Sequence, residues 1–398
     1  MKSGRNWEQL GMKYELKDIC KTNQSNYSKS DKWTFINYLD TGNITKNKID
    51  EIQYINLENE KLPSRAKRKV EIDDIIYSTV RPNQLHYGII KQIPNNFLVS
   101  TGFTTIKINR KIAEPKFIFY YITQDEITEH LSAIAEQSTS AYPSIKPSDI
   151  ENLEIDLPSL EIQKQIASIL SALDDKIELN NKINENLEQQ AYLLLEQMLS
   201  IPHDDVCCLS DIANINPRYT LSKGTEARYI DMSQLSTTTS FPDGWTFRPY
   251  NGGMKFKNKD TIMARITPCL ENGKTAYIDF LEGEEIAFGS TEYIVLSPKD
   301  NIPPELLYCI VRYPEFRTYA TINMNGSSGR QRVSGEIIGK YEIPSFTQEE
   351  LSEFGAVAEP LFKQITENSL QNRNLSALRD TLLPKLMNGE IDVSKVKI

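Results

Sequence analysis

The longest regular pattern in this sequence is an apolar seam between Leu160 and Leu199, and it limits how the rest of the chain can fold. Seam residues recur at alternating steps of four and three, while Gln, Glu, Lys and Asn occupy the other faces. No Pro or Gly interrupts the pattern, and Pro158 and Pro202 flank it. At about 1.5 Å per residue, the pattern predicts a helical rod of roughly 55–60 Å that needs a partner. The seam positions are Ile166, Leu170, Leu173, Ile177, Asn180, Asn184, Leu187, Ala191, Leu194 and Met198.

The chain supplies that partner itself, because the same seam returns 188 residues later. Both Asn layers are repeated, and the one clear departure is Arg379, which stands where the first seam has Ala191. Agreement of two polar layers and the apolar layers around them indicates an internal repeat. The second seam consists of Phe354, Ala358, Leu361, Ile365, Asn368, Asn372, Leu375, Arg379, Leu382 and Leu386.

Length and composition are those of a globular chain with two or three domains. Hydrophobic residues make up 39% of the 398 residues, and no apolar run approaches the length of a membrane span. The first residues lack the apolar stretch of a signal peptide, so we expect a cytoplasmic protein with no membrane contact. Five Cys with no CxxC spacing argue against a disulfide framework.

A net charge of −9 is unusual for a protein that binds nucleic acid, so its distribution matters. Counting Lys and Arg against Asp and Glu gives 0 for residues 1–156 and −6 for residues 157–206. Residues 207–343 carry −1 and residues 344–398 carry −2. The acidity lies mostly on the first long helix, and the two larger blocks can present basic faces.

The two blocks that precede the long helices follow a common plan. In block one, residues 75–80 and 103–108 read as strands, and residues 117–122 and 127–135 read as helices. Asp74-Ile75-Ile76 with Arg81-Pro82 corresponds to Asp260-Thr261-Ile262 with Thr267-Pro268 in block two. The exits also match, because residues 144–159 align with residues 330–345. The order is block, helix, block, helix.

Local sequence at the helices carries a resemblance to a known family. Its strongest parts are the run Leu157-Pro158-Ser159-Leu160-Glu161-Ile162-Gln163 and the run Leu173-Asp174-Asp175-Lys176-Ile177. The closing Leu382-Leu383-Pro384-Lys385-Leu386 is also typical, and residues 343–351 match more loosely. Over essentially its whole length, the chain resembles the DNA-specificity (S) subunit of type I restriction–modification systems.

The resemblance implies an α+β fold, with two mixed α/β target-recognition domains separated by an antiparallel two-helix coiled coil. Target-recognition domain 1 would span residues 1–156, followed by a central spacer helix and linker at 157–206. Target-recognition domain 2 would span 207–343, followed by the second spacer helix and tail at 344–398. An approximate internal twofold would relate the two halves.

The resemblance also implies a function and partners. Each domain would read one half of a bipartite double-stranded DNA target, and the helices would set the distance between the halves. The subunit itself would be non-catalytic and would need no cofactor. It would dock two adenine methyltransferase (M) subunits, and ATP-dependent restriction (R) subunits would join the full heteromeric complex.

The two Asn layers predict a register for the helices. An antiparallel pair with its axis near residue 182 would place Asn180 opposite Asn372, and Asn184 opposite Asn368. An Asn that faces an apolar residue would leave a buried polar group, at a cost of about 1–3 kcal/mol, so paired amides would fix the register. Alternatively, these Asn face solvent or a methyltransferase partner, and Ile183 takes the core position.

Motifs for chemistry are weak. Asn216-Pro217-Arg218-Tyr219 lacks the second Pro of an adenine methyltransferase tetrapeptide, and Pro268 stands where a P-loop ending at Gly273-Lys274-Thr275 requires Gly. The three His show no metal-ligand spacing with Cys, so no metal site is expected. Two rival functions stay open: a self-contained nuclease or methyltransferase, and a coiled-coil adaptor without DNA recognition.

DNA contacts have a better case, because Arg, Asn and Gln can read base edges while Lys serves phosphates. Candidates lie in a basic cluster, in the turn after the strand at 75–80, in two corresponding loops at residues 138–146 and 325–332, and at three lysines of block two. In block one they are Arg65, Lys67, Arg68, Lys69, Arg81, Asn83, Gln84, His86, Tyr87, Tyr142, Ser144 and Lys146. In block two they are Lys255, Lys257, Lys259, Ser327, Ser328, Arg330, Gln331 and Arg332.

Overall fold

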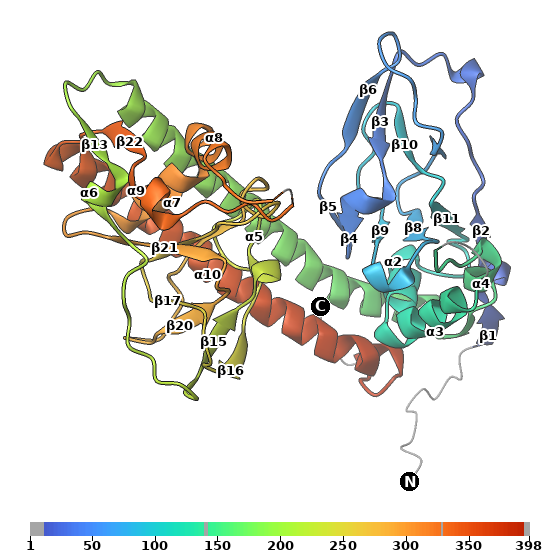
Figure 1. Cartoon of the computed structure of the whole chain (residues 1–398). Helices are drawn as coiled ribbons and strands as arrows, with labels where there is room; N and C mark the ends of the chain where they lie inside the picture. The colour runs from blue at the N-terminus through green and yellow to red at the C-terminus, as the bar shows by residue number, and fades with distance from the viewer. Residues whose placement is uncertain (1–11, 139–141, 328, 394–398) are drawn as a thin grey trace. The chain divides into compact units, whose positions relative to one another are not determined.

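The computed structural model of the chain describes residues 12–138, 142–327 and 329–393. By packing, the chain divides into two compact units, residues 1–175 with 375–398 and residues 176–374. Each unit therefore contains one of the two blocks together with segments of both long helices (Figure 1). The division differs from the one expected from sequence, in which the helices stood apart as segments of their own.

The strands among the described residues of the first unit form two four-stranded sheets and two two-stranded ladders, β1 with β12 and β4 with β5. Their bounds are β1 Met12–Glu15, β2 Cys20–Thr22, β3 Phe35–Leu39, β4 Ile44–Thr45, β5 Lys48–Ile49, β6 Gln53–Asn56, β7 Ala66–Arg68, β8 Ile75–Ser78, β9 Tyr87–Ile89, β10 Phe97–Ser100, β11 Phe103–Ile108 and β12 Glu154–Leu157. One sheet has the order β2-β11-β8-β9 and is antiparallel. The other has the order β6-β3-β10-β7, with β10 parallel to β3, and β1 pairs antiparallel with β12.

The helices of this unit cover the first sheet and complete its core. Their bounds are α1 Leu16–Ile19, α2 Pro115–Ile122, α3 Asp125–Glu136 and α4 Pro147–Glu151. All four residues of β8 are buried, and Phe117 and Ile118 of α2 pack into the same cluster as Ile75. The strands predicted at 75–80 and 103–108 and the helices predicted at 117–122 and 127–135 are confirmed.

The second unit repeats the two four-stranded sheets and the β1–β12 ladder, whereas the β4–β5 ladder has no counterpart among its described residues. Its sheets have the orders β14-β21-β18-β19 and β16-β15-β20-β17, with β20 parallel to β15, and β13 pairs antiparallel with β22. The strands are β13 Val206–Cys208, β14 Ala213–Ile215, β15 Glu226–Ile230, β16 Thr246–Pro249, β17 Met254–Phe256, β18 Thr261–Ala264, β19 Thr275–Tyr277, β20 Ala287–Gly289, β21 Tyr293–Pro298 and β22 Glu342–Pro344. The helices are α6 Leu209–Ile212, α7 Pro304–Arg312, α8 Pro314–Ile322 and α9 Gly335–Gly339. The repeat suspected from sequence therefore extends to the order of the strands.

The two seams lie in the longest helices, α5 Leu160–Ser200 and α10 Gln348–Met387. Within the second unit, the Asn180 side-chain amide donates to Asn372 Oδ1 at 2.8 Å, and the Asn368 side-chain amide donates to Asn184 Oδ1, also at 2.8 Å. Residue numbers rise on one helix as they fall on the other, so the segments run antiparallel. This is the pairing expected from the twofold arrangement. Ile183 is 36% exposed, so the alternative that placed it in the core is wrong.

The buried stripe of α5 drifts from the predicted seam beyond Asn184. Glu188 and Leu195 are buried, whereas Leu187 and Leu194 are only partly buried. On α10, Phe362 is likewise buried more deeply than Leu361. A straight helix has 3.6 residues per turn, so a strict 3.5 spacing moves gradually out of the contact face.

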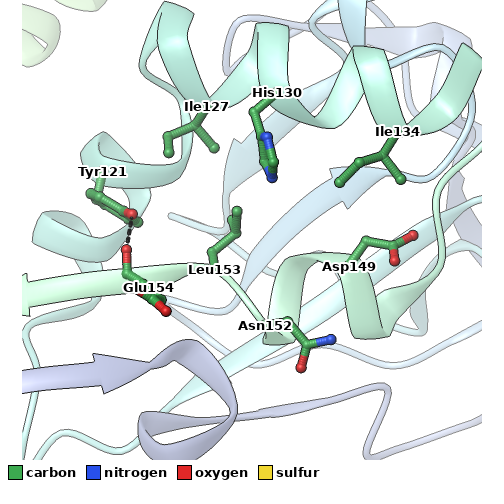
Figure 2. Close-up of a pocket in the computed structure, with 8 residues that line it drawn as sticks. All are labelled: Tyr121, Ile127, His130, Ile134, Asp149, Asn152, Leu153 and Glu154. Carbon is green, nitrogen blue, oxygen red and sulfur yellow. Dashed lines mark hydrogen bonds between the residues drawn. The ribbon is translucent and has the colours of Figure 1, made fainter.

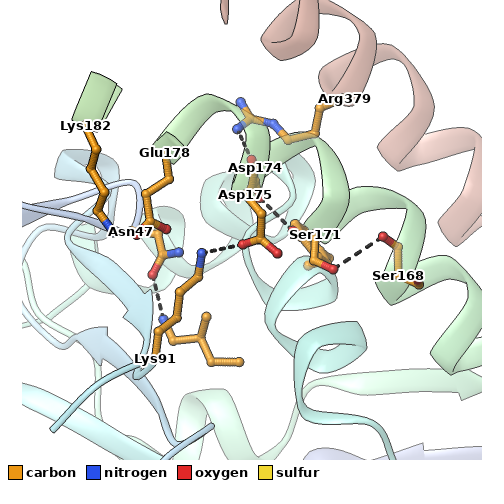
Figure 3. A network of polar contacts seen from close by, with 11 residues as sticks. Asn47, Lys91, Ser168, Ser171, Asp174, Asp175, Glu178, Lys182 and Arg379 are labelled. Carbon is orange, nitrogen blue, oxygen red and sulfur yellow. Dashed lines mark hydrogen bonds and ion pairs between the residues drawn. The ribbon is translucent and has the colours of Figure 1, made fainter. Parts of the chain in front are cut away.

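In the first unit the departure at Arg379 is explained by an ion pair. Its Nη1 atom lies 2.7 Å from Asp174 Oδ1, and Asp174 also accepts a hydrogen bond from the Tyr120 hydroxyl at 2.6 Å (Figure 3). Burial and the nearby Asp174 carboxylate raise the pKa of Tyr120. An Ala at this position could not join α10 to α5 in this way.

Candidate nucleic-acid interface

Two loops that sequence analysis selected in block one meet at the end of β8. Thr79 N–H donates to Gly102 O at 2.8 Å, Ile145 N–H to Thr79 O at 2.9 Å, and Arg81 N–H to Pro143 O at 2.9 Å. Val80 and Ser144 form an isolated bridge. Backbone bonds therefore hold the strand end, the β10–β11 turn and the loop before α4 together, and we name this arrangement the block-one junction.

Exposed polar side chains lie at the surface of this junction. Arg81 has a φ of +48°, which non-glycine residues rarely adopt, and its guanidinium lies 5.3 Å from the centre of the Tyr142 ring. Asn83 and Gln84 follow in a short 3₁₀ turn and are exposed. Arginine and amide side chains at one exposed edge can hydrogen-bond base edges.

Block two has the same junction with different side chains. Arg265 N–H donates to Glu292 O at 3.0 Å, Val333 N–H to Arg265 O at 3.0 Å, and Thr267 N–H to Gln331 O at 3.1 Å. Ile266 and Arg332 form the bridge that corresponds to Val80 and Ser144. We name this the block-two junction.

Arg332 is held inside the block-two junction rather than projecting from it. Its Nε and Nη2 atoms donate to the Glu292 carboxylate at 2.9 and 2.7 Å, and its Nη1 atom donates to Arg330 O at 3.0 Å. The hydrogen bonds from Arg332 lower the pKa of Glu292. Three of the five N–H donors of the guanidinium are thus engaged within the protein, and the contact of Arg332 with DNA stays a prediction. Ser327 and Arg330 in the same loop are exposed, and Gln331 is half-buried.

The basic cluster of block one is split by its local partners. Arg65 and Lys67 are exposed on either side of buried Ala66. Arg68 donates to Asn26 Oδ1 at 3.1 Å, and Lys69 forms an ion pair with Asp31. The strand alternation of β7 therefore leaves Arg65 and Lys67 as the exposed cations of the cluster.

The block-two lysines divide in the same way. Lys255 Nζ donates to Tyr219 O at 2.6 Å, and Lys257 lies 5.6 Å from the centre of the Tyr219 ring. Lys259 is exposed at a position with a φ of +74°. Lys259 is therefore the most exposed of these three candidate phosphate contacts.

Several other predicted contacts need revision. Tyr87 is a correction: it lies in the core, 8% exposed and stacked 5.7 Å from Tyr77, because it belongs to β9 rather than to the preceding turn. His86 Nδ1 lies 2.6 Å from Ile44 O, and Ser144 is half-buried in the bridge. Lys146 is exposed at the start of α4. Ser328 lies outside the described residues, as do residues 139–141 of the block-one loop.

Two residues of the block-two junction were not among the contacts predicted from the sequence. Arg265 and Glu292 are far apart in sequence, and neither lies in a basic cluster. The offset that matches Asp74 with Asp260 places Arg265 opposite Thr79, which could have drawn attention to it. Nothing in the sequence pairs Glu292 with Arg332.

Metal ligands, cysteines and membrane spans are the next features to consider among the described residues. No group of three His, Cys, Asp or Glu side chains among them could hold a metal ion, and the five Cys are unpaired thiols. Within the same residues, every helix is too short or too polar to cross a membrane. Gly273 lies in the turn before β19 with a φ of +72°, as expected for a turn rather than a P-loop.

Comparison with known proteins agrees with the duplicated arrangement. The family model of the type I restriction modification DNA specificity domain matches residues 8–189 and, a second time, residues 205–351. The chain belongs to this family. As a member of the type I specificity subunits, it has a role in DNA sequence specificity, in a family whose members are not themselves catalysts.

Similar relatives span the whole chain. The specificity subunit of the type I restriction enzyme HindI from Haemophilus influenzae is 25% identical and covers 95% of this chain and 99% of its own length. That of MjaIX from Methanocaldococcus jannaschii is 25% identical, covering 78% of this chain and 76% of its own. The crystal structure of a type I S subunit from M. genitalium shares the fold, with a TM-score of 0.56, 16% identity and coverage of 97% and 98%.

Proposed function

We propose that this type I specificity subunit recognises a bipartite DNA target, with one half-site read by each block. Residues 1–156 and 207–343 would be the two target-recognition domains, and residues 157–206 and 344–398 would form the spacer between them. The observation that carries this proposal is the junction built twice from the same backbone hydrogen bonds but with different side chains. A common frame with Arg81 and Tyr142 in one copy and Arg330 and Gln331 in the other suits two different base sequences.

The chain would do this as the non-catalytic subunit of a complex. Two adenine methyltransferase subunits would dock on it, and restriction subunits would join them, as the family resemblance implies. The relatives it matches carry names of specificity subunits of type I restriction enzymes.

The test is a block exchange. The chain is expressed with its methyltransferase partner, and methylated adenines are mapped by long-read sequencing. Replacing residues 207–343 with the same block of a relative should change one half of the recognised sequence and leave the other half unchanged. Swapping residues 1–156 is the matched control and should change the opposite half.

A chimera in which both halves change would contradict the assignment of one block to each half-site. Salt dependence separates this function from an adaptor without DNA recognition, because phosphate contacts make log K fall linearly with log salt.

A further inference from the structure

A hollow of about 400 Å³ opens in the first unit between α3, α4 and the start of β12. Figure 2 shows Ile127, His130 and Ile134 projecting from α3 toward Leu153 on the opposite wall. We name it the α3–α4 hollow. Its lining consists of Tyr121, Ile127, His130, Ile134, Asp149, Asn152, Leu153 and Glu154.

The internal repeat shows what occupies this place in the second unit. Leu16 N–H donates to Leu153 O at 3.0 Å, and Leu209 N–H donates to Tyr341 O at 2.8 Å. Tyr341 therefore corresponds to Leu153, and Ile337, four residues earlier, corresponds to Asp149. Gln124 directly precedes α3, and Tyr313 directly precedes α8. His130 and Tyr319 each lie six residues later, so Tyr319 corresponds to His130.

In the second unit a phenol fills the corresponding space. The Tyr319 hydroxyl donates to Ile337 O at 3.0 Å, and its ring lies 5.1 Å from that of Tyr341. Tyr341 also packs edge-on against Phe316, at 5.0 Å between ring centres. Where block two has two tyrosines and a phenylalanine, block one has His130, Leu153 and Ile127. The smaller side chains leave room for an aromatic ring, and the carbonyl of Asp149 corresponds to the acceptor of the Tyr319 hydroxyl.

The charge around the hollow favours a cation and disfavours DNA. Helix α3 carries Asp125, Glu126, Glu129 and Glu136 and has no Lys or Arg. Asp149 and Glu154 line the hollow itself, and no Lys or Arg does so. Such a surface repels phosphate and attracts basic side chains.

We propose that the α3–α4 hollow receives a tyrosine or phenylalanine of a protein partner whose neighbouring residues are Lys or Arg. Apolar walls and Leu153 bury the ring, and Asp149 and Glu154 pair with the flanking cations. The residues that line the hollow are not those named at the block-one junction, and the proposal does not depend on the function assigned to that junction.

The chain offers a direct reporter, because it has three His and one of them lines the hollow. Side-chain NMR signals of His86, His130 and His203 are followed in the full-length chain during titration with acetyl-Gly-Lys-Tyr-Arg-Gly-amide. The His130 signal should move and saturate with a dissociation constant on the order of 1 mM, a value suited to one buried ring. His86 and His203 should stay in place, and the same peptide with Ala for Tyr should have no effect.

Variants define the site further. Glu154→Gln should weaken binding of the tyrosine peptide about two- to fivefold, as expected for loss of one exposed charge pair. His130→Tyr and Leu153→Tyr each rebuild part of the block-two arrangement, and each should abolish binding, followed by peptide fluorescence anisotropy. If one of these two variants folds poorly, the other still tests whether filling the hollow prevents binding.

Three outcomes would overturn the proposal. The His130 signal could be unmoved by the tyrosine peptide. Both filling variants could bind the peptide as the wild type does. Finally, p-cresol without flanking cations could bind as tightly as the peptide, which would make the hollow a site for a small aromatic molecule instead.

Discussion

Arg81 lies in the block-one junction and Arg332 in the block-two junction, and their guanidinium groups make different contacts. Arg81 lies over the ring of Tyr142 and is exposed, so its guanidinium is accessible from solvent. Arg332 is fixed against Glu292 and the Arg330 carbonyl. The first is suited to read a base, and the second to hold the loop that carries Arg330 and Gln331.

Replacing Arg81 with Ala should relax one base position in one half-site and weaken recognition by about 1–3 kcal/mol. Arg81→Lys should restore the charge but not a bidentate contact, and so should recover affinity more than specificity. Methylation mapping and DNA binding measure the two effects. Arg332→Ala is the matched control, and its effect should be confined to the other half-site. Wild-type specificity in Arg81→Ala would remove this residue from base recognition.

Asp260 makes stability depend on pH. Its carboxylate accepts from Tyr219 and from the Lys257 N–H, and burial raises its pKa to about 6. Because this folded-state pKa lies above the ordinary value of 3.8, the native protein keeps a proton that the unfolded chain releases. The stability contributed at low pH is therefore lost as the pH rises from about 4 through about 6.

Asp260→Asn should remove that decline, since the amide does not ionise. Relative to wild type, the variant should gain about 2–3 kcal/mol of unfolding free energy between pH 4 and pH 7, from about two pKa units. Denaturant unfolding at several pH values measures it, with the exposed Asp300→Asn as control. Parallel pH profiles for wild type and Asp260→Asn would show that the carboxyl titrates normally.

At the scale of elements, the amide layers join α5 to α10 within the second unit. Asn180 is fully buried and donates to both Asn372 and Gln371, and Asn372 donates in turn to Asn181 at 2.9 Å. These amide hydrogen bonds give the buried donors their partners in the observed register of the two helices. That register is therefore favoured over shifts of one helical turn.

Asn180→Leu should destabilise the chain by about 1–3 kcal/mol, because it removes the donor to Asn372 Oδ1 and Gln371 Oε1. Adding Asn372→Leu should recover part of this loss, since two apolar groups can pack together. A double-mutant cycle of unfolding free energies measures the coupling. Strict additivity of the two single changes would show that the amides act independently.

Sequence patterns predicted these helices and the central strands well, because burial imposes a regular period on them. The seam was only partly right beyond Asn184, where Glu188 and Leu195 are buried together with the seam residues Ala191 and Met198. Of the site, the loops at 81–84 and 142–146 could be predicted from the polar residues that follow a buried strand. The Arg332–Glu292 ion pair could not be predicted, because its partners lie 40 residues apart in the sequence. The burial of Tyr87 could not be predicted either, because it depends on β9 beginning at this residue.

At the scale of the whole molecule, the overall charge of −9 conceals blocks that are close to neutral. Within block one, Lys67 projects from β7 and is exposed, whereas Lys69 is neutralised by Asp31. DNA affinity should therefore depend on a small number of unpaired cations rather than on net charge.

Lys67→Gln should lower the slope of log K against log salt by about one and weaken all DNA sequences alike, as loss of one phosphate contact does. Lys69→Gln should change the slope much less, because its charge is already paired with Asp31. Fluorescence anisotropy over a range of salt concentrations measures both. Equal slopes for wild type and Lys67→Gln would place β7 away from the DNA.

Main-chain bonds recur at the same places in the two junctions: Val80 pairs with Ser144 in one block and Ile266 with Arg332 in the other. Because peptide groups are common to all residues, mutations at positions 81, 142, 330 and 331 can alter the exposed chemistry while the supporting bonds persist. Descendants of such a gene could therefore acquire new preferences through a few codon changes, without first passing through an unfolded intermediate. Exchange of a whole block between related genes would do the same in one step, since strand order and attachment are common to both halves.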